Sequence, residues 1–184
     1  MSAVTAPTCV GAVLFTDLVG FTEFNEVVGD AQAVGVLDAQ TSYAKAALQS
    51  HADARLVKEL GDGLMLWFAD AGAAITAALE LMRSIETARQ DGSFPLAIRM
   101  GIHHGEAVAR GDDVVGQTVN IASRISDLAG PGELLVSDVA IGDALDHNGL
   151  AELDCAPIGP VQVKGVSEPI WLQRVLGLNQ SSGR

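Results

Sequence analysis

Short apolar runs and longer segments with helical periodicity alternate along this chain. The runs at residues 10–15, 54–60 and 64–68 have the length of buried strands rather than helices. The last two flank a Gly-Asp-Gly turn, which is typical of a β-hairpin. Apolar positions three and four residues apart predict three helices, over residues 30–50, 70–90 and 117–129.

The second half of the chain adds more strands, which we expect at residues 96–102, 106–109, 133–136 and, as two or three short strands, within 151–176. Ser137 and Asp138 are typical of the start of a further helix, which we expect to end near Leu145. This order of elements predicts an α+β fold in which helices cover a sheet. We expect one domain over residues 11–176, with flexible ends at residues 1–10 and 177–184.

Charge and composition limit the partners more than the fold. The 184 residues carry 23 acidic and 11 basic side chains, a formal net charge of −12, which argues against a nucleic-acid or anionic membrane surface. No apolar run is long enough for a membrane span, no secretory signal is visible, and Cys9 and Cys155 are isolated. We therefore expect a cytoplasmic protein, in which an anionic ligand binds only where cations reverse the local field.

Two aspartates lie at the ends of predicted strands. Asp17 follows the first strand, and Gly20 and a predicted helix start at Thr22 come directly after it. Such a corner can hold a divalent metal on the carboxylate or offer backbone N–H groups to a phosphate. Asp62 lies between the glycines of the hairpin turn. Both also have ordinary interpretations, as a helix cap and as a turn residue. If the first strand lies beside the hairpin, the two carboxylates converge in a way that suits two-metal phosphoryl transfer.

Other polar side chains have the spacing of a phosphate site but are equally compatible with a solvated surface. Asn120 and Arg124 share one face of the predicted 117–129 helix, where they could grip a phosphate or stabilise its developing charge. Lys58 shares a strand face with Asp62, about 13 Å away. Four histidines lack a third ligand at metal spacing and stay unassigned: His51, His103, His104 and His147.

Five stretches, in this order, resemble the catalytic domain of class III nucleotidyl cyclases. They are FTDLVGFT at 15–22, VKELGDG at 57–63, GIHHG at 101–105, DVVGQTVNIASR at 113–124 and VKG at 163–165. The resemblance covers residues 11–175, and the short segment between Gly105 and Asp113 is similar to that of short-arm bacterial adenylyl cyclases. It implies a ferredoxin-like α+β core related to polymerase palms, paired head-to-tail as a homodimer.

The resemblance also implies two metal ions and a phosphate cradle. Asp17 and Asp62 match the ligands of two Mg²⁺ or Mn²⁺ ions per active site, and Lys164 matches a lysine that holds the phosphates. Glu106 lies near a position where some members carry a phosphate-binding arginine, which predicts a looser grip on the phosphates. The backbone expected to cradle the β- and γ-phosphates runs through Leu18, Val19, Gly20, Phe21 and Thr22.

The implied substrate is ATP. Lys58 and Asp113 match the two positions that read the purine. Adenine offers an acceptor at N1 and a donor at N6, which complement an ammonium and a carboxylate, whereas guanine reverses both polarities. Asn120 and Arg124 match the pair that stabilises the transition state. The resemblance thus implies an adenylyl cyclase that forms 3′,5′-cyclic AMP and pyrophosphate.

In this family each active site spans two subunits, so a symmetric homodimer of this chain would have two equivalent sites. The short arm predicts weak dimerisation. Two alternatives stay open, a catalytically silent module that pairs with another cyclase chain and a cyclase specific for GTP. The full set of matching residues favours an enzyme, and Lys58 and Asp113 favour ATP. A regulatory partner of unknown identity is also left open.

Overall fold

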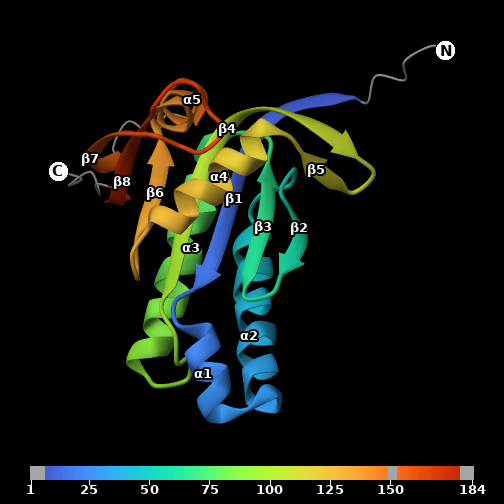
Figure 1. Ribbon diagram of the computed structural model, residues 1–184, viewed down its shortest axis with the longest axis vertical. Coiled ribbons are helices and arrows are strands. Elements are labelled where there is room, and N and C mark those ends of the chain that lie inside the picture. The colour runs from blue at the N-terminus through green and yellow to red at the C-terminus, as the bar shows by residue number, and fades with distance from the viewer. Residues whose placement is uncertain (1–6, 149–152, 179–184) are drawn as a thin grey trace.

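The first apolar run forms β1 (Thr8–Leu18), which lies between β3 (Gly63–Phe68) and β4 (Ile98–Arg110) in a mixed sheet. The remaining strands are β2 (Arg55–Leu60), β5 (Asp113–Val115), β6 (Leu134–Ser137), β7 (Leu153–Val161) and β8 (Ile170–Leu178). The computed structural model describes residues 7–148 and 153–178. Within these ranges the strand order is β2-β3-β1-β4-β6-β8-β7, and β5 pairs with the end of β4 (Figure 1).

Helices cover both faces of the sheet. They are α1 (Phe21–Val28), α2 (Asp30–Leu48), α3 (Ala71–Gln90), α4 (Gln117–Leu128) and α5 (Asp138–Asn148). Alternate residues of β1 point to opposite faces, so that Leu14 packs with α2, α3 and α5, whereas Val13 and Phe15 pack with α4. Figure 1 shows α4 on the near face and α3 on the far face. Burial on both faces explains why the central strands are apolar throughout.

The structure has the predicted α+β fold, and the hairpin of β2 and β3 around the Gly-Asp-Gly turn is confirmed. No helix in the described part of the chain is long and apolar enough to cross a membrane. β1 begins at Thr8 and β8 ends at Leu178, so part of each expected flexible end is strand. Residues 1–6 and 179–184 lie outside the described residues.

The expectation of separate strands at 96–102 and 106–109 was wrong, because β4 continues from Ile98 to Arg110 and pairs with β1 along its length. Two glycines within this continuous strand allow α4 to pack closely. A Cβ on Gly101 would overlap the backbone of Ser126, and one on Gly105 would lie 2.8 Å from Thr118 Oγ1. Close helix packing therefore accounts for glycines in the interior of this strand.

His103 lies inside β4 with 8% of its surface exposed, and its Nδ1 is 2.8 Å from Ser137 Oγ. Ser137 also accepts a hydrogen bond from the backbone of Ala140 in the first turn of α5. Burial, assisted by the neighbouring His104, lowers the pKa of His103 from 6.5 to about 4. The imidazole is therefore a neutral part of the core at physiological pH.

Stability is accordingly expected to fall on acidification. A histidine with a lowered folded-state pKa binds fewer protons than it does in the unfolded chain, so its contribution is present above the unfolded pKa and is lost as pH falls from 6.5 towards 4. Between about pH 7 and about pH 5 this loss should be about 2 kcal/mol. Urea unfolding of the wild type and of His103→Gln at both pH values measures it. Equal pH slopes for the two proteins would contradict this assignment.

Candidate active site

The end of β1 and the β2–β3 turn bring Asp17 and Asp62 together. β1 and β3 are antiparallel, and their last register pair joins Asp17 to Gly63, the residue after Asp62. A Cβ on Gly63 would lie 2.9 Å from the Thr16 carbonyl oxygen and 3.8 Å from Asp17 Oδ1. The glycine thus lets the turn approach β1 closely. We refer to Asp17 and Asp62 as the carboxylate pair.

The two negative charges of the carboxylate pair repel each other. Partial burial raises the pKa of Asp62, and the negative charge of Asp17 raises it further, while the turn's own backbone and Arg99 act in the opposite direction. Arg99, the register partner of Asp17 on β4, donates from Nε and Nη2 to Asp17 Oδ2 at 2.7 and 2.6 Å. The Arg99 guanidinium therefore acts on both carboxylates, through hydrogen bonds to Asp17 and through its charge on Asp62.

Mg²⁺ and Mn²⁺ are hard cations that prefer oxygen ligands, and a pair of converging carboxylates fits them. The mutual repulsion that raises the pKa of Asp62 is what a cation placed between the groups would relieve. In residues 7–148 and 153–178, no group of three or more His, Cys, Asp or Glu side chains could hold a metal ion. Ions bound by the carboxylate pair would hence need further ligands from outside the pair, such as phosphate oxygens.

The predicted phosphate cradle follows β1 directly. Gly20 adopts φ 77° and precedes α1, which begins at Phe21. The N–H of Val19 already donates to the Ala97 carbonyl at 2.8 Å. The first N–H groups of a helix have no acceptor within the helix. The donors that this loop can offer to a phosphate therefore include those at the start of α1, Phe21 and Thr22, but not the Val19 N–H.

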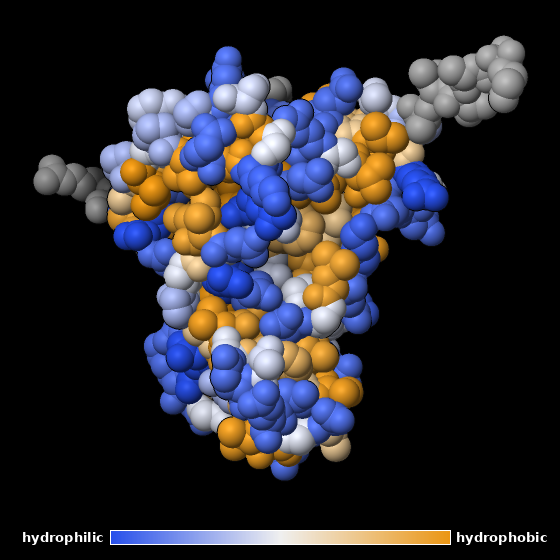
Figure 2. All heavy atoms as spheres, in the orientation of Figure 1, coloured by the Kyte–Doolittle hydropathy of each residue, from blue (hydrophilic) through white to orange (hydrophobic). Residues whose placement is uncertain are grey.

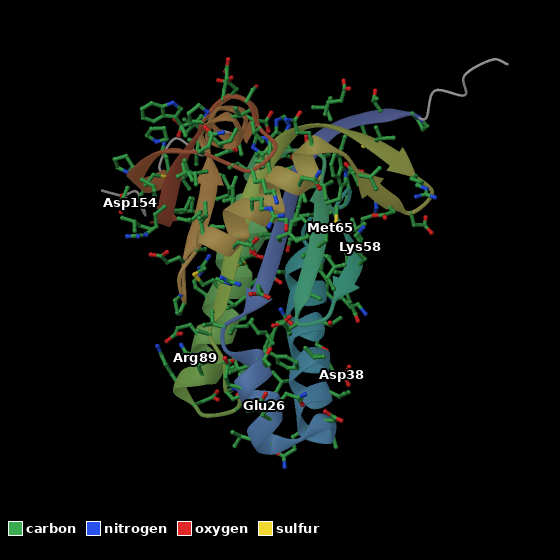
Figure 3. The ribbon with its side chains drawn as sticks, in the orientation of Figure 1. Glu26, Asp38, Lys58, Met65, Arg89 and Asp154 are labelled. Atoms are coloured by element: carbon green, nitrogen blue, oxygen red, sulfur yellow. The ribbon has the colours of Figure 1, made fainter. Side chains whose placement is uncertain are left out.

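Lys58 and Asp113, which are 55 residues apart in the sequence, meet at the edge of the sheet. Lys58 lies on β2 beside Met65 of β3 (Figure 3), and Asp113 is the first residue of β5. Lys58 Nζ is 2.8 and 2.9 Å from the two carboxylate oxygens. The hydrogen bond from Lys58 lowers the pKa of Asp113, which also accepts from the Val114 N–H. The structure thus places an ammonium and a carboxylate side by side, about one-third exposed.

The remaining predicted residues do not contact the carboxylate pair. Asn120 and Arg124 are exposed on α4, where Arg124 Nη1 lies 3.4 Å from Asp127 Oδ2. Lys164 is exposed in the turn that connects β7 and β8. Among the described residues, none of these three side chains forms a hydrogen bond or ion pair with the carboxylate pair. Within one copy of the chain, the described side chains therefore do not join these three residues to the carboxylate pair directly.

Sequence reasoning missed Arg99 and Gln40. Arg99 also donates from Nη1 to the Asp127 carbonyl at 3.1 Å, which connects the end of α4 to the carboxylate pair. Gln40 on α2 is buried and donates to Thr16 Oγ1 and to the Asp62 carbonyl. The available signals were a charged residue within an apolar strand and a polar residue at a core position of a helix.

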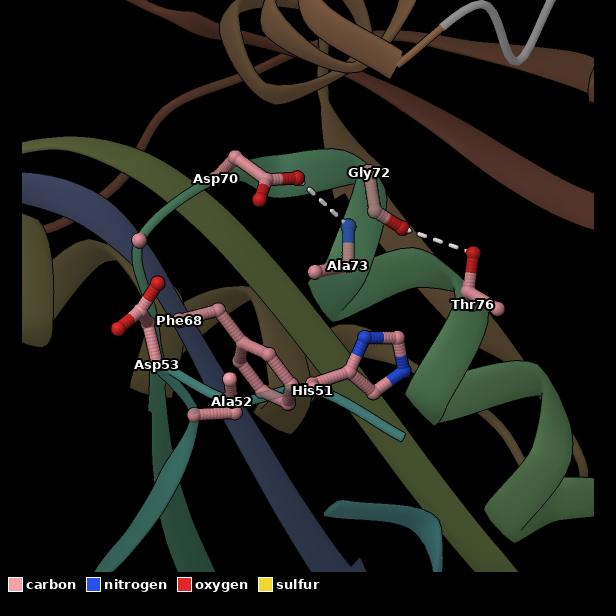
Figure 4. Close-up of a pocket in the computed structure, with 10 residues that line it drawn as sticks. His51, Ala52, Asp53, Phe68, Asp70, Gly72, Ala73 and Thr76 are labelled. Atoms are coloured by element: carbon pink, nitrogen blue, oxygen red, sulfur yellow. Dashed lines mark hydrogen bonds between the residues drawn. The ribbon is translucent and has the colours of Figure 1, made fainter. Parts of the chain in front are cut away.

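A separate pocket of about 400 Å³ lies between the α2–β2 connection and the start of α3. Figure 4 shows His51 and Phe68 in it, and Asp70, whose side chain caps α3 by accepting from the Ala73 N–H at 2.7 Å. None of the residues predicted to act on a nucleotide lines this pocket. This pocket is therefore not part of the site that the carboxylate pair forms.

Comparison with known proteins finds relatives that all fall in one family. Residues 5–174 match the family described as the adenylate and guanylate cyclase catalytic domain. The chain is 34% identical to a pH-sensitive adenylate cyclase of Mycobacterium tuberculosis over 89% of its length and 38% identical to an adenylate cyclase of Streptomyces griseus over 76%. It spans only 40% and 33% of those proteins. The crystal structure of the adenylyl cyclase CyaB from P. aeruginosa has the same fold, with a TM-score of 0.83, 24% identity, and coverage of 98% of this chain and 100% of CyaB.

Proposed function

Because the chain belongs to the family of adenylate and guanylate cyclase catalytic domains, we propose that it is an adenylyl cyclase that converts ATP to 3′,5′-cyclic AMP and pyrophosphate. The observation that carries the choice of ATP is the contact between Lys58 Nζ and the Asp113 carboxylate at 2.8 and 2.9 Å. The curated relatives named above, both called adenylate cyclases, support the same choice.

The purine is read by inserting its edge into this ion pair. Lys58 donates to N1 of adenine and Asp113 accepts from the N6 amino group, so that each charge exchanges its partner for a matched base atom. Guanine would place a donor against the ammonium and an acceptor against the carboxylate. A site built from matched polar groups rejects such a mismatch strongly, because its own groups are left unpaired.

At the other end of the nucleotide, Asp17 and Asp62 would hold two Mg²⁺ or Mn²⁺ ions. When bound, such ions lower the pKa of the ribose 3′-hydroxyl and neutralise the departing pyrophosphate. Arg99 keeps Oδ2 of Asp17 occupied and so orients its carboxylate. The N–H groups at the start of α1 donate to the β- and γ-phosphates.

The other catalytic residues come from a partner subunit. Asn120 positions the ribose, Arg124 meets the charge that develops at the α-phosphate, and Lys164 holds the leaving phosphates. Among the described residues none of the three bonds to the carboxylate pair within one chain, which supports a head-to-tail homodimer with two shared sites. Figure 2 shows both hydrophobic and hydrophilic residues exposed on the face that carries α4, a mixture that a non-obligate interface shares with the rest of a protein surface.

Incubation of the purified protein with Mn²⁺ and either ATP or GTP, followed by chromatography of the products, tests the proposal. Cyclic AMP from ATP, with little cyclic GMP from GTP, is the expected result. Cyclic GMP as the main product would show a guanylyl cyclase. No cyclic product from either nucleotide would favour a silent module that pairs with another cyclase chain.

Lys58→Met is expected to lower kcat/KM for ATP by about thirtyfold and to reduce the preference for ATP over GTP. The methionine keeps the apolar stem but leaves N1 of adenine without a donor, at a cost of about 2 kcal/mol. Initial rates with both nucleotides measure the change. Lys45→Met, at an exposed position of α2, is the matched control and should leave the preference unchanged. An unaltered ratio of ATP to GTP rates in Lys58→Met would show that Lys58 does not read the base.

A further inference from the structure

Gln40 is a polar side chain in the apolar core beneath the carboxylate pair. It lies on α2 with 1% of its surface exposed, one helical turn before the buried Ala44. A buried amide is retained in a core when its hydrogen bonds are satisfied. Its contacts therefore indicate what it does.

Both contacts of the Gln40 amide nitrogen lie next to the carboxylate pair. Nε2 donates to Thr16 Oγ1 at 3.2 Å and to the Asp62 carbonyl oxygen at 3.3 Å. Thr16 directly precedes Asp17 in β1 and is itself 1% exposed. A single NH₂ group thus connects the two backbone segments that carry the carboxylates.

This connection lies where the sheet no longer holds the segments together. The register pairs of β1 and β3 end at Asp17 and Gly63, so the ladder does not include Asp62. Asp17 and Asp62 lie at this end of the ladder, and their like charges tend to push the turn away from β1. Arg99 opposes this by its charge, but its hydrogen bonds to the carboxylate pair reach Asp17 Oδ2 and not the turn that carries Asp62. Gln40 is uncharged and holds both segments.

We propose that Gln40 is a positioning residue, which sets the separation of the two carboxylates and thereby the affinity of the site for divalent cations. The inference rests on the proposed function, since it concerns the same carboxylate pair. Residues that orient metal ligands from behind change metal affinity or activity by about tenfold to a hundredfold when they are removed.

Gln40→Met tests the proposal, because methionine has a similar length and shape but no donor. Mn²⁺ binding is measured by electron paramagnetic resonance with saturating 3′-deoxy-ATP, which lacks the attacking hydroxyl. The dissociation constant for Mn²⁺ should rise about tenfold or more, and kcat for ATP should fall by a similar factor. The KM for ATP should change by less than about twofold, since no contact to the base is altered.

Gln173→Met is the matched control. Gln173 Nε2 donates to Asp138 Oδ1 at 2.8 Å, between β8 and α5, so this variant also loses one amide hydrogen bond. It should bind Mn²⁺ like the wild type. A melting curve in EDTA shows whether each variant is folded. If Gln40→Met does not fold, Thr16→Val serves instead, because it keeps the shape of the side chain and removes one of the two acceptors of Gln40.

The outcomes separate this inference from the proposed function. Weaker Mn²⁺ binding in Gln40→Met, or in Thr16→Val where that variant is used, with an unchanged control supports the role of Gln40. Wild-type affinity in the folded variant overturns it and leaves the cyclase proposal intact. A wild-type protein that binds no Mn²⁺ overturns the two-metal function itself, and the positioning role with it.

Discussion

Replacing Asp17 with asparagine is expected to lower the turnover of ATP by about a thousandfold or more. The amide keeps the shape of the side chain but removes the charge that would hold the ions, and metal ions contribute several kcal/mol to phosphoryl transfer. The loss should appear in kcat at saturating Mn²⁺ rather than in the KM for ATP, because the purine contacts of Lys58 and Asp113 are unchanged. Steady-state rates of cyclic AMP formation measure it.

Asp38→Asn is a suitable control for this substitution. Asp38 is exposed on α2 (Figure 3), and its neutralisation changes the net charge of the chain by the same amount. Its turnover should equal that of the wild type. Asp17→Asn should also stay folded, since it weakens the ion pair with Arg99 but relieves the repulsion with Asp62. Near-normal turnover in Asp17→Asn would contradict the metal-binding role of the carboxylate pair.

Arg124→Ala is expected to lower kcat by several hundredfold, the usual effect of removing a preorganised donor to a developing negative charge. Its side chain is 56% exposed, and its contact to Asp127 lies at 3.4 Å on the surface, where ion pairs contribute little to stability. The melting temperature should therefore stay within a few degrees of that of the wild type. Arg83→Ala, at an exposed position of α3, is the control and should retain full activity.

Mixing Asp17→Ala with Arg124→Ala tests whether sites are shared. If each site takes Asp17 from one subunit and Arg124 from the other, a mixed dimer has one intact site and one doubly defective site. Half of the dimers in an equal mixture are mixed, so activity should recover to about a quarter of the wild-type value. No recovery at any ratio would show that both residues act within one chain.

Local patterns predicted what depends on neighbours in the sequence. The Gly-Asp-Gly turn and its two apolar flanks specified the β2–β3 hairpin, and Gly20 specified the left-handed residue before α1. Local patterns failed at β4, which was expected as two strands but is continuous and packs its Gly101 and Gly105 against α4. The sequence does not distinguish a glycine required by a turn from one required by a neighbouring helix. The residue is the same in both cases, and only the structure shows whether backbone conformation or close packing requires it.

By itself, the sequence determined the α+β class, the family and the residues that match its motifs, since these depend on side-chain identity and order. Only the tertiary structure decided which of them meet. The pairing of β1 with β3 and β4 places Asp17 beside Asp62 and Arg99, and the approach of β5 to β2 joins Lys58 to Asp113. The packing of α2 against the sheet likewise brings Gln40 into contact with Thr16 and Asp62. Such contacts join residues 22 to 82 positions apart, and their energies depend on burial and geometry that no local pattern encodes.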